Sequence, residues 1–191
     1  MNTFTKHAFL AAVAACAVVA TASQVLSQET KKDAAPKQQQ ANKAKGALEA
    51  QDARYLRQIA QADLAEVQAG KLAANKASNA EVKRFAQHMV DDHGKHLGEA
   101  RSLAKSKGMQ LPSAPAKKHQ DAMKKLEGMS GAAFDRAYMQ QMVKDHEEEL
   151  KLVQETAKKA KDKELKSAAE KAVPVIQKHL EMAKSTAAAV K

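Results

Sequence analysis

The sequence predicts an all-α protein, a four-helix bundle with a longer connection between its second and third helices. Ala, Lys, Glu, Gln, Leu and Met dominate the 191 residues, with no Trp, 7 Gly and 4 Pro. This mixture favours helices over sheets. Apolar residues recur at spacings of three and four over long segments, which is the period of an amphipathic helix. The pentapeptide Met-Val-x-Asp-His occurs at 89–93 and again at 142–146, near the middle of two such segments.

The N-terminal residues are typical of an export signal. Lys6 gives the segment a charged start, and residues 8–20 form an apolar run that is too short to span a bilayer. The Ala-Thr-Ala sequence at 20–22 fits the small-x-small rule for cleavage, so we expect a signal peptide at 1–22. Cys16 ends a Val-Ala-Ala-Cys sequence that is similar to a bacterial lipoprotein box, so a lipid anchor on Cys16 is the alternative.

The segment that follows, residues 23–46, consists largely of Gln, Lys, Ala and Ser and has no bulky apolar residues in any period. Such a composition predicts a disordered tether. Because Cys16 is the only cysteine, cleavage after residue 22 would leave a mature protein without disulfides or thiolate metal sites.

The helical bundle is expected over 47–191, and its first helix over 47–75. The second helix is opened by Ser78, which forms a capping box with Glu81, and it stops at Gly108. Residues 108–115 contain two prolines and interrupt the helical pattern.

The longer connection continues with a short helix, expected over 116–126. Ser130 is placed to cap the third helix, which runs to about residue 161. Asp162 is placed to cap the fourth helix, which extends nearly to the end of the chain. Pro174 falls inside that helix, where it removes one backbone donor and bends the helix.

Three histidines fall on the apolar stripes of three of these helices. His93, His146 and His179 are each spaced by three and four from apolar neighbours. Counted from a turn at residue 162, His146 and His179 are 16 and 17 residues away, so they stand at nearly the same height in an antiparallel pair. The same count from the first turn places Glu66 and His93 within about one helical turn of each other. We therefore predict that these four residues meet in the middle of the bundle.

Two methionines extend this candidate site. Met89 and Met142 each precede a histidine by four positions, and a thioether and an imidazole at that spacing can hold a soft metal such as Cu(I). The alternative is that the methionines fill the core and that each histidine has a structural partner. The other three histidines of these segments, His88, His96 and His119, are expected at the surface. Asp92 and Asp145 are expected at the surface or beside the site.

The formal net charge is +10 at pH 7. This excess predicts either a solvated lysine-rich surface or attraction to the anionic polymers and lipid headgroups of a cell envelope. The two Tyr and four Phe offer little for stacking on bases, which argues against nucleic acid as a partner. We expect no transmembrane span in the mature protein. The partners that we expect are a metal ion and an anionic envelope surface.

From about residue 50 to residue 184 the chain resembles the bacterial exported domain-of-unknown-function family 4142. The matching segments follow one another in order and spacing: Glu81–His93, Gly108–Pro112, Phe134–His146, Val173-Pro174 and His179-Leu180. The resemblance implies a ferritin-like four-helix bundle and a location in the periplasm or cell envelope. It implies no established biochemical activity.

A ferritin-like fold suggests a di-iron oxidase, but the ligand pattern argues against one. Di-iron bundles carry Glu-x-x-His on two helices, whereas the residues three positions before His93, His146 and His179 are Val, Val and Ile. Glu149 follows His146 by three, which is the reverse order. Similarity of fold alone is not evidence for oxidase activity.

We therefore expect a non-catalytic, exported helical-bundle protein of the cell envelope that binds copper, zinc or iron. Its candidate metal ligands are His93, His146, His179, Glu66, Met89 and Met142. The alternative is an envelope stress or interaction protein with purely structural histidines. A ferritin-like oxidase is the third interpretation.

Overall fold

The computed structural model describes residues 46–190. Those residues form five helices and no strand: α1 (Ala50–Lys76), α2 (Ala80–Ser106), α3 (Lys117–Glu127), α4 (Gly131–Lys159) and α5 (Lys163–Ala189). The predicted all-α bundle, with a short helix in its longer connection, is confirmed. The expected signal peptide at 1–22, Cys16 and nearly all of the expected tether at 23–46 lie outside the described residues.

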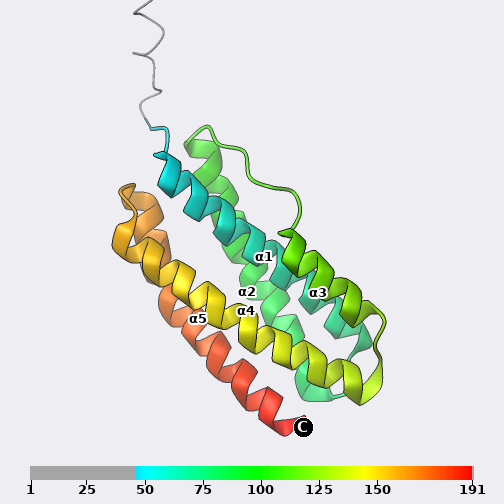
Figure 1. Ribbon diagram of the computed structural model, residues 1–191. Coiled ribbons are helices and arrows are strands. Elements are labelled where there is room, and N and C mark those ends of the chain that lie inside the picture. The colour runs from blue at the N-terminus through cyan, green and yellow to red at the C-terminus, as the bar shows by residue number, and fades with distance from the viewer. Residues whose placement is uncertain (1–45, 191) are drawn as a thin grey trace, which may run out of the picture. The chain divides into compact units, whose positions relative to one another are not determined.

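The four long helices pair into two antiparallel hairpins, α1 with α2 and α4 with α5 (Figure 1). α1 also packs against α4, and α2 packs against α5, so the hairpins close into a four-helix bundle. The connection after α2 returns along the bundle to α3, which lies against α1 and α4. None of the described helices is long and apolar enough to cross a membrane.

The start of α2 differs by one residue from the prediction. Asn79 is the cap, and its side chain accepts hydrogen bonds from the backbone amides of Glu81 (2.7 Å) and Val82 (3.4 Å). The prediction that Ser78 is the cap is wrong, because the Ser78 hydroxyl instead donates to Asp135 of α4. Asn and Ser are almost equally good caps, so this long-range partner determines which of them is used.

Other helix ends follow from local signals as predicted. Gly108 follows α2 with a φ of 66°, a left-handed conformation that glycine adopts without steric cost. Asp162 caps α5 by accepting hydrogen bonds from the backbone amides of Glu164 (3.1 Å) and Leu165 (3.0 Å). Ser130 stands at the N-cap position of α4, although its side chain makes no capping hydrogen bond.

Two buried aspartates tie each hairpin to the turn of the other. Asp135 of α4 accepts hydrogen bonds of 3.0 Å and 2.9 Å from the backbone amides of residues 78–79, between α1 and α2. Asp52 of α1 accepts bonds of 3.0 Å and 2.7 Å from the amides of residues 161–162, between α4 and α5. These bonds fix the axial position of one hairpin against the other. Residues in the middle of the four long helices are therefore held at a common height.

The two largest apolar clusters of the core are separated by a layer of buried polar side chains, and a third, smaller cluster contains Ala60, Leu64 and Leu97. The cluster near the turn between α1 and α2 includes Phe85, Met89, Phe134, Tyr138 and Met142. The cluster near the turn between α4 and α5 includes Tyr55, Leu56, Val153, Leu165 and Ile176. The polar layer consists of Asp63, Glu66, His93, His146, Glu149 and His179. Burying so many ionisable groups is costly unless they are paired or bind a ligand, so the polar layer is the candidate site.

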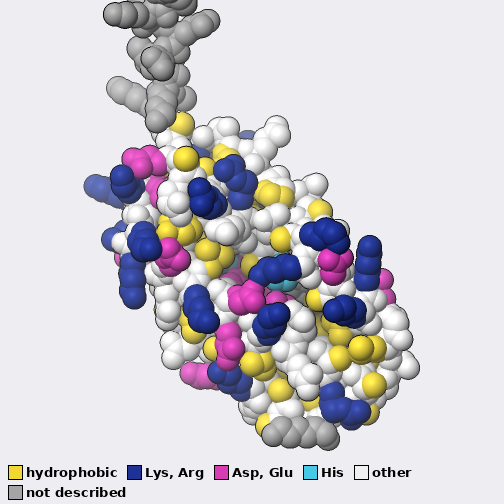
Figure 2. Space-filling model, viewed as in Figure 1, with side chains coloured by type: hydrophobic (Ala, Val, Ile, Leu, Met, Phe, Trp, Pro, Cys, Tyr) yellow, Lys and Arg dark blue, Asp and Glu magenta, His cyan; other side chains and the backbone are white. Residues whose placement is uncertain are grey.

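Lysine and arginine side chains are spread over the face of the molecule in Figure 2, with aspartate and glutamate side chains among them. The excess of positive charge is therefore not gathered into one patch on this face. The anionic envelope surface expected as a partner would meet dispersed charges here.

Candidate metal centre

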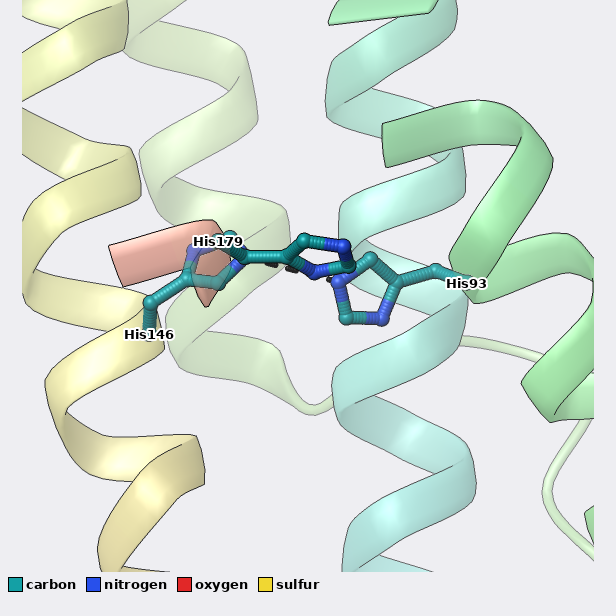
Figure 3. A group of neighbouring side chains, drawn as sticks. All are labelled: His93, His146 and His179. Atoms are coloured by element: carbon teal, nitrogen blue, oxygen red, sulfur yellow. Dashed lines mark hydrogen bonds between the residues drawn. The ribbon is translucent and has the colours of Figure 1, made fainter. Parts of the chain in front are cut away.

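The polar layer is built around three imidazole rings that point toward one another from three helices (Figure 3). His93 comes from α2, His146 from α4 and His179 from α5, and all three are at most 1 % exposed. Their ring centroids are 5.4 Å apart for His93 and His146, 5.3 Å for His93 and His179, and 5.7 Å for His146 and His179. Each ring has a nitrogen within 4.8 Å of a nitrogen of both others. The structure thus brings together the three histidines that the sequence placed on apolar stripes.

Hydrogen bonds fix the tautomers of two of these rings. The Nδ1–H of His93 donates to Asp63 Oδ1 at 2.9 Å, and the Nδ1–H of His146 donates to the backbone carbonyl of Met142 at 2.8 Å. When both rings are neutral, each carries only one N–H, and each then directs an Nε2 lone pair toward the other. The two Nε2 atoms are 3.4 Å apart. Two nitrogens bound to one tetrahedral Zn²⁺ at about 2.0–2.1 Å lie roughly 3.3 Å apart, so the observed spacing matches a shared cation.

His179 is held in the same way by an acceptor outside the ring cluster. Its Nε2–H donates to Asp92 Oδ2 of α2 at 2.9 Å, which leaves a lone pair on Nδ1. That Nδ1 atom is buried and has no hydrogen-bond partner among the described residues. All three rings therefore donate one N–H to a carboxylate or carbonyl oxygen and keep the other nitrogen as an acceptor. Metal-binding histidines have this arrangement in nearly every protein.

Three buried carboxyl groups lie near the Nδ1 atoms of His93 and His146. Asp63 Oδ1 accepts a second hydrogen bond, of 3.0 Å, from Nδ1 of His96. Glu149 Oε1 lies 3.8 Å from Nδ1 of His93, and Glu66 Oε1 lies 3.9 Å from Nδ1 of His146. Within the described residues, neither oxygen of Glu149 has a hydrogen-bond partner, and the same holds for Oε2 of Glu66.

Beyond the three-histidine set, two further ligand sets overlap in the polar layer. One combines Asp63, His93, His96 and Glu149, and the other combines Glu66, His146 and Glu149. In each set, one ligand atom from every residue lies within 4.8 Å of the others. Glu149 belongs to both sets, so its carboxylate is placed to bridge two cations. Nitrogen and oxygen donors of these types suit Zn²⁺, Cu²⁺ and Fe²⁺.

The electrostatics of the layer keep most of these groups uncharged in the absence of a cation. Burial, and then the charges of His93 and other neighbours, lowers the pKa of His146 to about 3. The same causes lower the pKa of His179 to about 4, although Asp92 opposes the shift. Burial, with smaller contributions from nearby carboxylates, raises the pKa of Glu66 and of Glu149 well above the ordinary value. The two imidazoles are thus neutral at pH 7, as metal ligands must be.

Asp63 is the carboxylate that the layer keeps ionised. Burial by itself would raise its pKa, but the hydrogen bonds from His93 and His96 outweigh burial and hold the pKa of Asp63 below its ordinary value. Burial would likewise lower the pKa of His96, and the bond to Asp63 reverses that effect, so its pKa is raised. Asp63 therefore orients His93 with a fixed negative charge.

Of the other candidate ligands, Met89 and Met142 are fully buried members of the apolar cluster next to the layer. Met142 contributes through its backbone carbonyl, which orients His146. The expectation that His96 and His119 lie at the surface is wrong. Their side chains are only 20 % and 11 % exposed, because His96 turns inward to Asp63 and His119, on α3, turns toward Asp145 of α4. His88, in contrast, is 38 % exposed.

The polar layer contains residues that the sequence reasoning missed. Asp63 continues the apolar stripe of α1, four positions after Ile59 and three before Glu66, and Glu149 continues the stripe of α4 three positions after His146. Acidic residues in a stripe of apolar ones are the signal that could have found them. No comparable signal marks Asp92, because its partner His179 lies 87 residues away in the sequence.

The geometry can now be compared with known proteins. The model of a family described as a domain of unknown function, DUF4142, matches residues 35–186. The chain belongs to this family. Among curated proteins no match is found. DUF4142 membership agrees with the resemblance seen in the sequence, and it assigns no activity to the polar layer.

Two solved structures share the fold. One is a DUF305 fragment from Deinococcus radiodurans, with a TM-score of 0.67, 9% sequence identity and coverage of 74% of this chain and 98% of that chain. The other is a DUF305 protein from Streptomyces coelicolor, described as a candidate secreted protein, with a TM-score of 0.63, 16% identity and coverage of 73% and 93%. At these identities the similarity establishes the fold alone.

Proposed function

We propose that this DUF4142 protein is an exported, non-catalytic metal-binding protein of the bacterial cell envelope. Its metal centre would be the group formed by His93, His146 and His179. One observation carries the proposal: each of the three rings donates one N–H to an oxygen, and the three remaining nitrogens converge. Three imidazoles with an open fourth position form a well-known type of zinc site. Copper and iron are the other metals that this ligand set suits.

The structural interpretation of the histidines explains less of this geometry. Purely structural histidines would be satisfied by their partners, whereas here the Nε2 atoms of His93 and His146 face each other at 3.4 Å. Two facing acceptors repel unless a proton or a metal cation lies between them. The Nδ1 atom of His179 is a further buried acceptor without a partner in the described part of the chain. A cation would satisfy all three nitrogens at once.

Export is the part of the proposal that rests on the sequence. The segment at 1–22 has the charged start, apolar run and cleavage sequence of a signal peptide. The DUF305 protein from Streptomyces coelicolor, described as a candidate secreted protein, is consistent with such a location for this fold. A thiol-free metal site of imidazoles also suits a compartment in which thiols are oxidised.

Calorimetric titration of the demetallated protein with Cu(I), Cu(II), Zn(II) and Fe(II) tests the proposed function. We expect at least one of these ions to bind with a Kd below about 10 μM, which corresponds to a binding free energy of roughly −7 kcal/mol. If none binds that tightly, the histidines are structural, and an envelope interaction protein becomes the function to test next.

A second candidate function, a ferritin-like oxidase, is favoured by one observation. Glu149 is shared by two adjoining ligand sets, as a carboxylate that bridges two irons would be. Aerobic addition of Fe²⁺ tests this candidate. An oxidase would bind two irons per polar layer and consume O₂ as the ferric colour develops, whereas the three-histidine centre would bind one ion without consuming O₂.

A further inference from the structure

A second group of metal-binding side chains lies at the surface, directly against the three-histidine centre. Oδ2 of Asp92 is 2.9 Å from Nε2 of His179 and 3.3 Å from Nε2 of His88. The rings of His88 and His179 pack edge to face with centroids 5.3 Å apart. One donor atom from each of these three residues lies within 4.8 Å of the other two.

This surface group differs from the centre in its exposure to solvent. The side chains of His88 and Asp92 are 38 % and 39 % exposed, whereas that of His179 is 1 % exposed. A groove of about 660 Å³ between α2 and α5 is lined by Asp92, His93 and His179, among others. An ion bound by His88 and Asp92 would therefore be in contact with water and one imidazole ring away from the buried centre.

His179 belongs to both groups, with one ring nitrogen for each. Nε2 faces Asp92 and His88, and Nδ1 is the buried nitrogen that has no partner in the described residues. An ion on Nε2 requires the ring proton to be on Nδ1, and an ion on Nδ1 requires it to be on Nε2, where Asp92 accepts it. The neutral ring keeps one proton in both states, so an ion can pass inward while the proton moves outward, with no net change at His179.

We propose that His88, Asp92 and His179 form an entry site that captures a divalent transition-metal ion from solution and passes it to the buried centre. This inference rests on the proposed function, because the buried centre is the destination of the ion. His88 would affect how fast the centre fills and not how tightly it holds the ion. Asp92 would affect both, because it captures the ion and also orients His179.

The test is stopped-flow absorbance of Co²⁺ uptake by the demetallated protein, since Co²⁺ in a tetrahedral nitrogen site has visible bands. The variants are His88→Ala and a matched control, Gln87→Ala. Gln87 is the exposed neighbour of His88 and makes the equivalent contact one position earlier, to Asp91 at 2.9 Å. We expect His88→Ala to slow the filling of the centre about tenfold, the lower end of what local capture adds to an association rate. Its equilibrium affinity for Co²⁺ should equal that of the parent, and Gln87→Ala should match the parent in both.

Three outcomes are distinguishable. Slow filling with unchanged affinity in His88→Ala supports the entry site. Equal filling rates for His88→Ala, Gln87→Ala and the parent would overturn the entry site while leaving the buried centre in place. If the parent itself takes up no Co²⁺, the proposed function fails and the entry site fails with it.

Discussion

His93 Nε2 and His146 Nε2 lie 3.4 Å apart in the middle of the bundle, and hydrogen bonds on the far side of each ring direct these two nitrogens toward each other. His146 is oriented by the carbonyl of Met142, which is part of the α4 backbone. His93 is oriented by the buried carboxylate of Asp63, which a second hydrogen bond from His96 also holds. The centre is therefore preorganised, and little free energy would be spent on arranging ligands when an ion binds.

Removing one imidazole should weaken metal binding. His146→Ala deletes a nitrogen from the three-histidine set, so we expect affinity for Zn²⁺ or Cu²⁺ to fall by at least about tenfold. Mutating even a group that only hydrogen-bonds to a metal ligand typically lowers metal affinity by about that factor or more. His119→Ala is the control, because His119 is also a partly buried histidine but belongs to none of the ligand sets. Equal affinities of the two variants, measured by calorimetry, would contradict a centre built on His146.

Metal binding should release protons from carboxyl groups and not from His146 or His179. With pKa values of about 3 and 4, these two imidazoles are neutral at pH 7, so a metal ion displaces no proton from the nitrogen that binds it. The raised pKa values of Glu66 and Glu149 mean that these groups lose protons when a nearby cation stabilises their anions. An indicator dye in weakly buffered solution measures the release on addition of Zn²⁺. The double variant Glu66→Gln and Glu149→Gln should release fewer protons, and equal release would exclude these carboxyls as the source.

The demetallated protein should lose stability toward both ends of the pH range. The pKa of Glu149 is raised on folding, so its contribution is present below the unfolded value of 4.5 and is lost as pH rises through the folded value. The lowered pKa values of His146 and His179 act in the opposite direction. Their contributions are present above the unfolded value of 6.5 and are lost as pH falls toward about 4 and about 3.

Glu149→Gln isolates the carboxyl contribution to this profile. Relative to the parent, the free energy of unfolding of the demetallated variant should increase between pH 5 and pH 8 by at least about 1 kcal/mol. A difference of less than one unit between the folded and unfolded pKa values of Glu149 is enough for this increase. Urea unfolding at several pH values measures it. Glu147→Gln, on the exposed face of the same helix, is the matched control and should follow the parent. A variant curve parallel to that of the parent would show that the pKa of Glu149 is not raised on folding.

The aspartate ties at the two turns should matter for stability and not for metal affinity. Asp52→Ala leaves two backbone amides at the turn between α4 and α5 without their acceptor, which should cost about 2 to 4 kcal/mol of unfolding free energy. Asp52→Asn keeps one side-chain oxygen and should cost less. Unfolding in urea measures both variants. A Zn²⁺ affinity that falls tenfold in folded Asp52→Asn would mean that this tie also shapes the metal centre.

Several features of the fold could be predicted because their causes are local. Gly108 and Asp162 end and begin helices through their own backbone and side chain, so the sequence around them suffices. His93, His146 and His179 could be grouped because helical periodicity and the distance from each turn fix both face and height. The choice between Ser78 and Asn79 as a cap could not be made, since it depends on a partner 57 residues away.

The surroundings of the three histidines were harder to predict than the histidines themselves. Asp92 directly precedes His93, and a helix places such neighbours about 100° apart, so a position at the surface or beside the site was the natural expectation. The adjacent helix α5 brings His179 to that face, and Asp92 becomes its hydrogen-bond acceptor. Asp63 was overlooked because an acidic residue in an apolar stripe looks like an interruption of the pattern. Contacts between helices give both residues their roles.

The most direct test is anomalous X-ray scattering from crystals of the protein loaded with Zn²⁺. We predict a strong peak at about 2.0–2.1 Å from Nε2 of His93, Nε2 of His146 and Nδ1 of His179, with Asp63, the Met142 carbonyl and Asp92 still accepting from the opposite ring nitrogens. Crystals equilibrated with excess Zn²⁺ that keep the three rings in place but have no anomalous peak between them would contradict the metal centre.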